Sequence, residues 1–145
     1  MNALPESGAS LAERTIRLTR AELLRYAAAS GDHNQIHQDE TVALAMGLPG
    51  VIAHGMLTMG AAVQPVVDWV AGLKPDADGT RARIVEYGVR FTRMVVVDAV
   101  EGAEVHIAAK VGAVDEGTRI VRVDLTVTAA EQTVLGKAQV RVAVP

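Results

Sequence analysis

The stretch that decides the fold is GMLTMGAAVQPVVDWVAGL, residues 55–73 of a 145-residue chain. It is apolar on almost every side, which is typical of a helix enclosed by other structure and not of one lying on a surface. Pro65 should kink this helix, and Gly60 and Gly72 lower its intrinsic propensity, so burial has to hold it together. We therefore predict a long central helix wrapped by the rest of the chain.

The sequence after residue 81 predicts the sheet that wraps around this helix. Three segments alternate apolar and polar side chains with the period of two that a sheet with one dry face requires. Their apolar members are Val105, Ile107, Ala109 and Val111, then Val121, Val123, Leu125 and Val127, and finally Ala138, Val140, Val142 and Val144. DEGT and AAEQT mark hairpin turns between them, and residues 83–97 add at least one earlier strand.

Helices followed by a run of antiparallel strands indicate an α+β fold. An antiparallel sheet curled around one long central helix is the arrangement called a hotdog, and its paired subunits usually join their sheets edge to edge. We expect a single hotdog domain over residues 15–145, dimerising, behind a flexible N-terminal tail over residues 1–14. The tail has neither a basic region nor an apolar core, so it does not resemble a secretion signal.

Composition and charge limit the classes of partner that the protein can be expected to bind. The net charge is -3 and no run of Lys or Arg interrupts the sequence, which argues against nucleic acid or an anionic membrane. The chain has no cysteine, hence no disulfide frame and no thiolate nucleophile. We expect a cytoplasmic protein with a small-molecule substrate.

Polar chemistry concentrates in SGDHNQIHQDE, residues 30–40. A helix capped by Thr19, with Glu22 completing a capping box, should end just before this segment, and a short helix stopped by Gly47 should follow it. On a helix Asp32 and His37 would lie about 140° apart, but in a loop both side chains can point into one cavity. An imidazole beside a carboxylate can take up and return protons, as water addition or removal demands.

His54 and Gly55 stand at the start of the buried helix. A backbone N–H at a helix N-terminus has no partner within the helix and lies at the positive end of the dipole. Gly55 is thus a candidate oxyanion site for a carbonyl that gains negative charge, and glycine lets a substrate approach closely. Met56 and Met59 are either core residues or the lining of a tunnel for an acyl chain.

Two other interpretations of these residues remain open. Asp32 and His37 could be an ordinary turn former and surface residue. Together with His54 they also include the ligand types of a two-histidine, one-carboxylate metal centre, but no H-E-x-x-H spacing is present and acid–base chemistry needs the same groups free. We expect no metal and no cofactor.

Two motifs resemble one family. YAAASGDHNQIH is similar to the hydratase-2 motif of the MaoC-like (R)-specific enoyl-CoA hydratases and (3R)-hydroxyacyl-carrier-protein dehydratases, in which S-G-D-x-N-P-hydrophobic-H is typical. VIAHGMLTMG resembles the family's second signature, and EYGVRFTRMVVV extends the likeness into the strands. The phrases IAHGMLTMG and YGVRFT look most like the catalytic subunit of the actinobacterial (3R)-hydroxyacyl-carrier-protein dehydratases.

The resemblance implies a hydro-lyase of fatty-acid or polyketide metabolism. It would add water reversibly to trans-2-enoyl thioesters of coenzyme A or an acyl carrier protein, with Asp32 and His37 as the catalytic dyad. Gly55, Asn34, His54 and Met56 would then serve the oxyanion or substrate-binding site. His37 is our choice of base in hydration and Asp32 of acid, although the sequence does not decide these roles.

The alternatives are a non-catalytic acyl-binding hotdog partner subunit and a hotdog thioesterase. Acyl-chain length, the carrier, and the choice between homodimer and heterodimer are not readable from the sequence. One departure from the motif is Gln35, which stands where the family has proline and removes a fixed φ from the loop.

Overall fold

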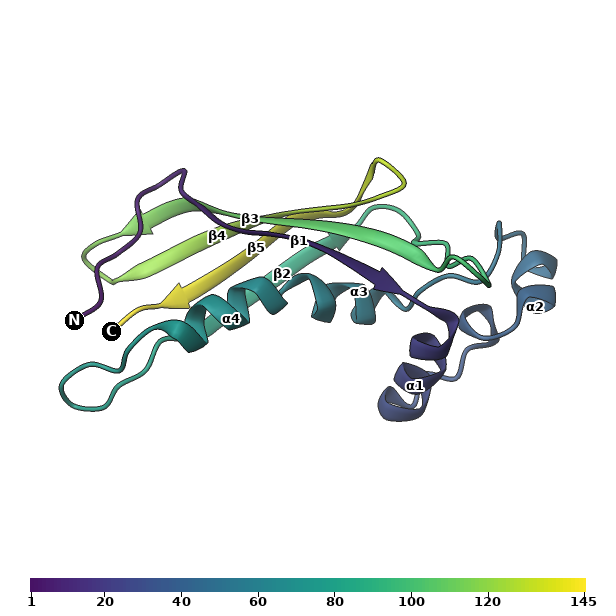
Figure 1. Ribbon diagram of the computed structural model, residues 1–145, viewed down its shortest axis with the longest axis horizontal. Helices are drawn as coiled ribbons and strands as arrows, with labels where there is room; N and C mark the ends of the chain where they lie inside the picture. The colour runs from purple at the N-terminus through teal and green to yellow at the C-terminus, as the bar shows by residue number, and fades with distance from the viewer.

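The computed structural model describes residues 1–145. The chain forms one sheet of five strands. Figure 1 shows this sheet curving above a layer of helices. All strand pairs are antiparallel, and the order across the sheet is β1-β3-β4-β5-β2. The strands are β1 Ser10–Leu18, β2 Arg83–Phe91, β3 Ala103–Asp115, β4 Ile120–Ala129 and β5 Gln132–Ala143. The helices are α1 Arg20–Ser30, α2 Glu40–Ala45, α3 Gly55–Ala62 and α4 Gln64–Gly72, with a 3-10 helix at Gln35–His37.

The inner face of the sheet carries the predicted alternation. Every second residue of β4 is buried, and Val121, Val123 and Val127 are fully inaccessible to solvent. Val123 lies opposite Val111 of β3 and Val140 of β5, so β-branched side chains form continuous rows across the strands. These rows face α3 and α4 and make up most of the core. The predicted α+β arrangement, one antiparallel sheet with a helix on its inner face, is confirmed.

The expected helix over residues 55–73 is two helices that meet at Val63. Pro65 lies in the first turn of α4, where its missing N–H removes one hydrogen bond from a continuous helix. The Gln64 side chain instead donates to the Gly60 carbonyl at 3.0 Å. The predicted kink is therefore a complete break between two helices.

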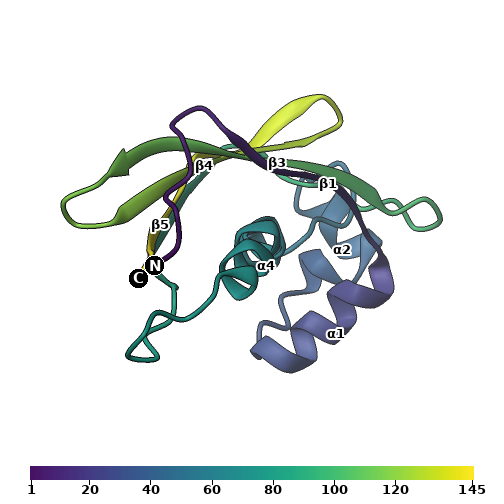
Figure 2. The same ribbon diagram turned by 60° about the vertical axis from the view of Figure 1, so that its left-hand side comes forward.

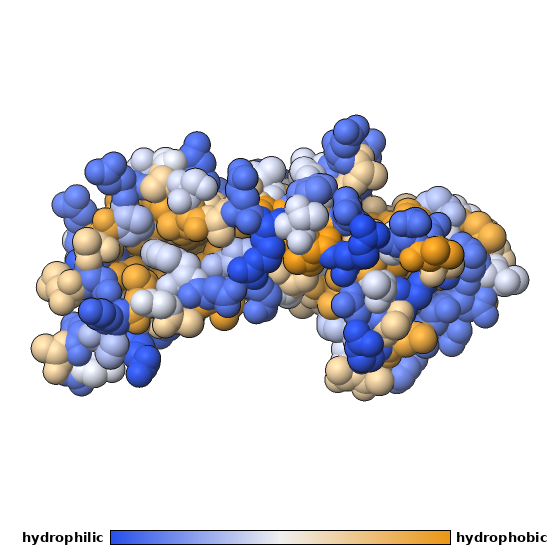
Figure 3. Space-filling model, in the orientation of Figure 1, coloured by the Kyte–Doolittle hydropathy of each residue, from blue (hydrophilic) through white to orange (hydrophobic).

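These helices are not enclosed on every side within one chain. Val66 of α4 is fully buried against the sheet, but Val67 is 37% exposed and Met56 of α3 is 60% exposed. Figure 2 shows the sheet curving over one side of α4 while the opposite side stays open. Apolar surface also shows beneath the sheet in Figure 3. The sheet therefore covers one side of these helices, and their other side is exposed in the single chain.

The predicted tail overlaps the first strand. Ser10 to Leu18 form β1, an edge strand paired with β3, whereas we expected residues 1–14 to be flexible. Arg14 occupies an inward-facing position of β1 and donates to the Asp68 carboxylate of α4 at 2.7 Å. The charged residue at an inward position hid the alternation of this strand.

The remaining helices lie at one end of the molecule. Thr19 caps α1 and forms the predicted capping box with Glu22, and Gly31 ends the helix with φ 79°. Asp39 caps α2 by accepting from the Val42 amide. Figure 1 shows both helices gathered beyond the end of β1, beside the start of α3. No helix is long and apolar enough to span a membrane.

Candidate active site

The loop between α1 and α2 is shaped by a chain of short side-chain-to-backbone hydrogen bonds. The Asp32 amide donates to Ser30 Oγ, the Asn34 amide to Asp32 Oδ1, and the Ile36 amide to Asn34 Oδ1, each at 3.2 Å. Such bonds turn the backbone at polar residues without a regular helix or strand. Asn34 thereby caps the 3-10 helix that ends at His37.

His37 is held in one orientation. Its side chain is buried, and Nδ1 lies 2.7 Å from the Ile52 carbonyl. A carbonyl only accepts, so Nδ1 carries the hydrogen and Nε2 of the neutral ring presents a lone pair. Nε2 lies 4.0 Å from Asp32 Oδ2. That distance is too long for a direct hydrogen bond but allows one water molecule to contact both groups.

His54 lies behind the dyad. Its ring stacks on His37 with centroids 3.9 Å apart, meets the Tyr26 ring edge-on at 4.7 Å, and donates from Nε2 to the Asp32 main-chain carbonyl at 3.1 Å. Burial lowers the pKa of His54 below its ordinary value, and the hydrogen bond to Asp32 opposes this only in part. His54 is therefore a neutral ring at physiological pH.

A cavity of about 550 Å³ opens beside His37. Gly55 and Thr58 of α3 line one wall, and Phe91, at the end of β2, lines another. The Gly55 N–H begins α3 and makes no hydrogen bond within the protein. A Cβ at Gly55 would lie 2.9 Å from Phe91 Cε1, so the close approach of this ring requires glycine. The free N–H at a helix N-terminus can donate a hydrogen bond to an oxygen that develops negative charge.

The structure separates the predicted site residues into two groups. His37 and Gly55 line the cavity, and the Asp32 carboxylate lies 4.0 Å from His37 Nε2 without lining the cavity itself. Asn34 braces the loop from outside the cavity, and Met56 turns away from it with its side chain exposed. The remaining predicted residue, His54, is buried behind His37 and does not line the cavity.

Other cavity residues escaped the sequence analysis. Thr58 is buried and follows Gly55 by three residues, a spacing that shares one helix face, so the pattern contained a signal for it. Phe91, Arg93 and Gln132 come from the ends of two strands, and only the sheet topology brings them to His37.

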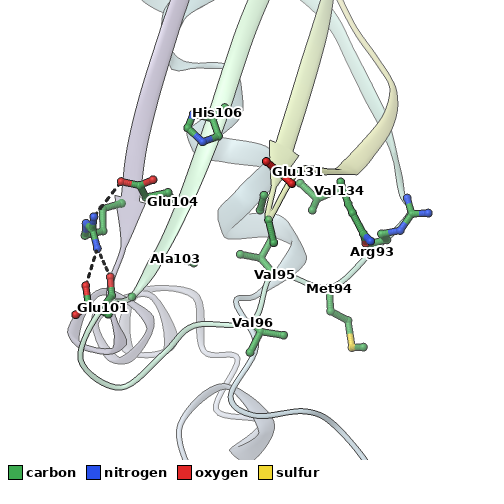
Figure 4. Close-up of a pocket in the computed structure, with 15 residues that line it drawn as sticks. Arg93, Met94, Val95, Val96, Glu101, Ala103, Glu104, His106, Glu131 and Val134 are labelled. Atoms are coloured by element: carbon green, nitrogen blue, oxygen red, sulfur yellow. Dashed lines mark hydrogen bonds and ion pairs between the residues drawn. The ribbon is translucent and has the colours of Figure 1, made fainter.

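A second, larger cavity of about 790 Å³ lies on the other side of the 93–96 segment, away from the dyad. Figure 4 shows Glu101 and Glu104 on one rim, Met94 and Arg93 on the other, and His106 above them. Arg17 of β1 donates to the main-chain carbonyl of Glu101 and to the carboxylate of Glu104. We assign the chemistry to the smaller cavity because only that one contacts His37 and Gly55.

The donor set fits proton transfer better than metal binding. Asp32, His37 and His54 each offer a ligand atom within 4.8 Å of the others. A metal ion needs nitrogen lone pairs, which lie in the ring planes, to converge on one point. The two rings are stacked with only 23° between their planes, so their lone pairs run nearly parallel. His54 Nε2 is also committed to the Asp32 carbonyl.

Comparison with known proteins identifies the family of the chain. The family model of the MaoC-like domain matches residues 5–133. The 3-hydroxyacyl-thioester dehydratase X of Mycobacterium tuberculosis is 41% identical over 87 residues, which are 60% of this chain and 27% of that protein. The fatty acid synthase beta subunit TOXC of Cochliobolus carbonum is 42% identical over 71 residues, 49% of this chain and 3% of that protein. The chain thus spans about a quarter or less of these relatives.

Solved structures share the whole fold. A MaoC-like dehydratase superposes with a TM-score of 0.87 at 35% identity, covering 97% of this chain and 41% of that one. The R-hydratase PhaJ1 from Pseudomonas aeruginosa superposes with a TM-score of 0.74 at 27% identity, covering 97% of this chain and 83% of that one. The family match and the shared hotdog fold agree. This chain belongs to the MaoC-like dehydratase domain family.

Proposed function

We propose that the protein is a hydro-lyase that adds water reversibly to trans-2-enoyl thioesters and removes it from (3R)-hydroxyacyl thioesters. The observation that carries the proposal is that His37 and Gly55 line one cavity, where Gly55 has a free N–H and His37 Nε2 lies 4.0 Å from Asp32 Oδ2. The similarity to a 3-hydroxyacyl-thioester dehydratase and to an R-hydratase supports the reaction class.

In hydration, the water held between the dyad attacks the β-carbon of the enoyl group. His37 Nε2, which presents the lone pair of the neutral ring when Nδ1 carries the hydrogen bonded to Ile52, accepts the water proton, and the Asp32 carboxyl group delivers a proton to the α-carbon. The thioester carbonyl gains negative charge between these steps and is stabilised by the Gly55 N–H. Dehydration runs through the same groups in reverse.

The direct test is turnover of enoyl thioesters by the purified protein. Loss of enoyl-thioester absorbance should follow addition of the wild type, tested with coenzyme A and with acyl-carrier-protein substrates over a range of chain lengths. Asp32→Asn and His37→Ala should each lower kcat by about 10²–10⁴-fold, the usual contribution of a positioned acid or base. Both variants should keep the wild-type fold.

Three outcomes would overturn the proposal. Full activity in both variants would remove the dyad from the reaction. Release of free thiol without enoyl loss would indicate a thioesterase. Activity that appears only with a second hotdog subunit, and that persists in the Asp32 and His37 variants, would identify this chain as a non-catalytic partner.

We also propose that the chain pairs with a second hotdog subunit along β2, as a homodimer or heterodimer. β2 is an edge strand bonded only to β5, and its Val85 is 48% exposed. An apolar hollow of about 260 Å³ between α4 and β2 lies beside it, lined by Val67 and Ile84 among others. Structures of similar fold include the ChsH1-ChsH2 and HadBC complexes of Mycobacterium tuberculosis.

Light scattering of the purified chain tests this pairing. We expect a dimer for the wild type, and a shift to monomer when Val85→Lys places a charge on the strand edge. A wild-type monomer that also fails to bind any hotdog partner would contradict it.

A further inference from the structure

We propose that His54 is a positioning residue that holds Asp32, His37 and the Gly55 N–H in one fixed arrangement. The inference rests on the proposed hydro-lyase function and goes beyond it, because the buried His54 ring does not line the cavity and contacts both members of the dyad. The role proposed for this ring is exercised through its neighbours.

Three contacts of one residue carry the proposal. The ring lies flat against His37 at a centroid distance of 3.9 Å, which limits rotation of the proposed base about its own axis. Nε2 donates to the main-chain carbonyl of Asp32 at 3.1 Å, which ties the proposed acid's backbone to the same ring. His54 is the N-cap of α3, and its carbonyl accepts from the Thr58 amide at 3.2 Å. The next N–H in the chain is that of Gly55.

The environment of the ring supports a fixed neutral tautomer. His54 is 2% exposed, and Nδ1 is buried without a hydrogen-bond partner. A second proton on Nδ1 would leave a charged ring without a counter-charge on that side, and burial lowers the pKa of His54 accordingly. The titratable side chains around the ring are His37, Asp32 and Tyr26. A neutral His54 must carry its one hydrogen on Nε2 to bind the Asp32 carbonyl.

An unsatisfied buried acceptor destabilises a fold, so stability alone does not explain a histidine here. A phenylalanine would fill the same space and stack on His37 without the unsatisfied nitrogen. What phenylalanine lacks is the N–H that reaches Asp32. This donor is therefore the feature that distinguishes positioning from packing.

Two variants separate these contributions. His54→Phe keeps a flat ring against His37 and loses the donor, whereas His54→Gln keeps a side-chain N–H at a similar reach and loses the ring. We expect both to fold, with kcat lowered by about 10- to 100-fold in His54→Phe because the dyad loses its preorganisation. KM should stay within about threefold of wild type, and His54→Gln should recover part of the lost kcat. His33→Gln, in the same loop but exposed, is the matched control and should keep the wild-type kcat.

A merely structural role would lower the melting temperature of His54→Phe while kcat per folded molecule stayed at the wild-type value, and that result would overturn the proposal. Nitrogen NMR of the imidazole rings in the wild type gives an independent readout. A doubly protonated His54, or one with its hydrogen on Nδ1 at pH 7, would overturn it as well, whether or not the variants fold. Absence of wild-type turnover with the expected tautomer would instead count against the proposed function.

Discussion

Removal of the Gly55 N–H is the sharpest test of the oxyanion site. Proline has no N–H and is favoured in the first turn of a helix, and His54 already has the extended conformation, φ -58° and ψ 131°, that a residue before proline prefers. The Gly55 N–H has no partner in the protein, so its loss leaves no acceptor unsatisfied. The obstacle is the Phe91 ring, which lies 2.9 Å from the position of a new Cβ.

The design therefore compares Gly55→Pro with Gly55→Ala in a Phe91→Ala background. Both variants carry a Cβ, and the contact with the Phe91 ring is gone in both. Proline differs from alanine in that Cδ replaces the amide hydrogen and Cγ closes the ring. Loss of one oxyanion donor lowers kcat by about 10²–10³-fold, or about 2.7–4 kcal/mol of transition-state stabilisation. We expect that ratio between the alanine and proline variants, measured by loss of enoyl-thioester absorbance, with similar melting temperatures.

A proline variant within about threefold of the alanine variant would refute the reasoning, because an oxyanion donor should contribute far more than that. The comparison requires that the two variants have equal melting temperatures, which circular dichroism measures. The Phe91→Ala protein itself serves as the reference for both double variants.

Three further predictions concern stability. Gln35→Pro should raise the free energy of unfolding by about 0.4–1 kcal/mol in denaturant titration. The reason is that the Gln35 N–H donates no hydrogen bond and that Asn34 already has φ -57° and ψ 126°, which suit a residue before proline. A lower denaturation midpoint would contradict this. Ala130 and Glu131 form the β4–β5 turn with φ 48° and 60°, so Ala130→Asn with Glu131→Gly should stabilise the fold by about 1–2 kcal/mol at an unchanged m-value. Burial lowers the pKa of His54 from 6.5, so the unfolded chain binds a proton that the folded chain resists. The free energy of unfolding should then fall as the pH drops below about 6.5, by at most about 1.4 kcal/mol per pH unit, and His54→Gln should flatten that slope.

Much of the fold was predictable from local patterns. The alternation in β4, the capping box at Thr19 and the glycine that ends α1 each act over a few residues, so their physical causes are visible in the chain itself. The predicted loop between α1 and α2 was equally local, since Asp32 and Asn34 turn their own backbone. With Gln35 in place, Asn34 still has the backbone conformation that a residue before proline adopts, so this departure from the family motif changes the loop geometry little.

Other features depend on contacts between distant residues. β1 was missed because Arg14 faces inward, which is favourable only because Asp68 of α4 lies 2.7 Å away. The break at Val63 is accompanied by a hydrogen bond from the Gln64 side chain to the Gly60 carbonyl of the preceding helix, which no local pattern predicts. Phe91 reaches Gly55 across 36 positions of sequence, and no local pattern predicts that approach.

The sequence by itself determined the classes of element, their order, and the presence of a carboxylate, an imidazole and a helix N-terminus suited to acid–base chemistry. Only the tertiary structure decided how these groups are placed relative to one another. It placed Asp32 and His37 across a gap that fits one water, and it moved His54 from the expected substrate wall to a position behind the dyad. The reason is physical: a side chain's chemistry is local, whereas its direction is set by packing against residues far away in the chain.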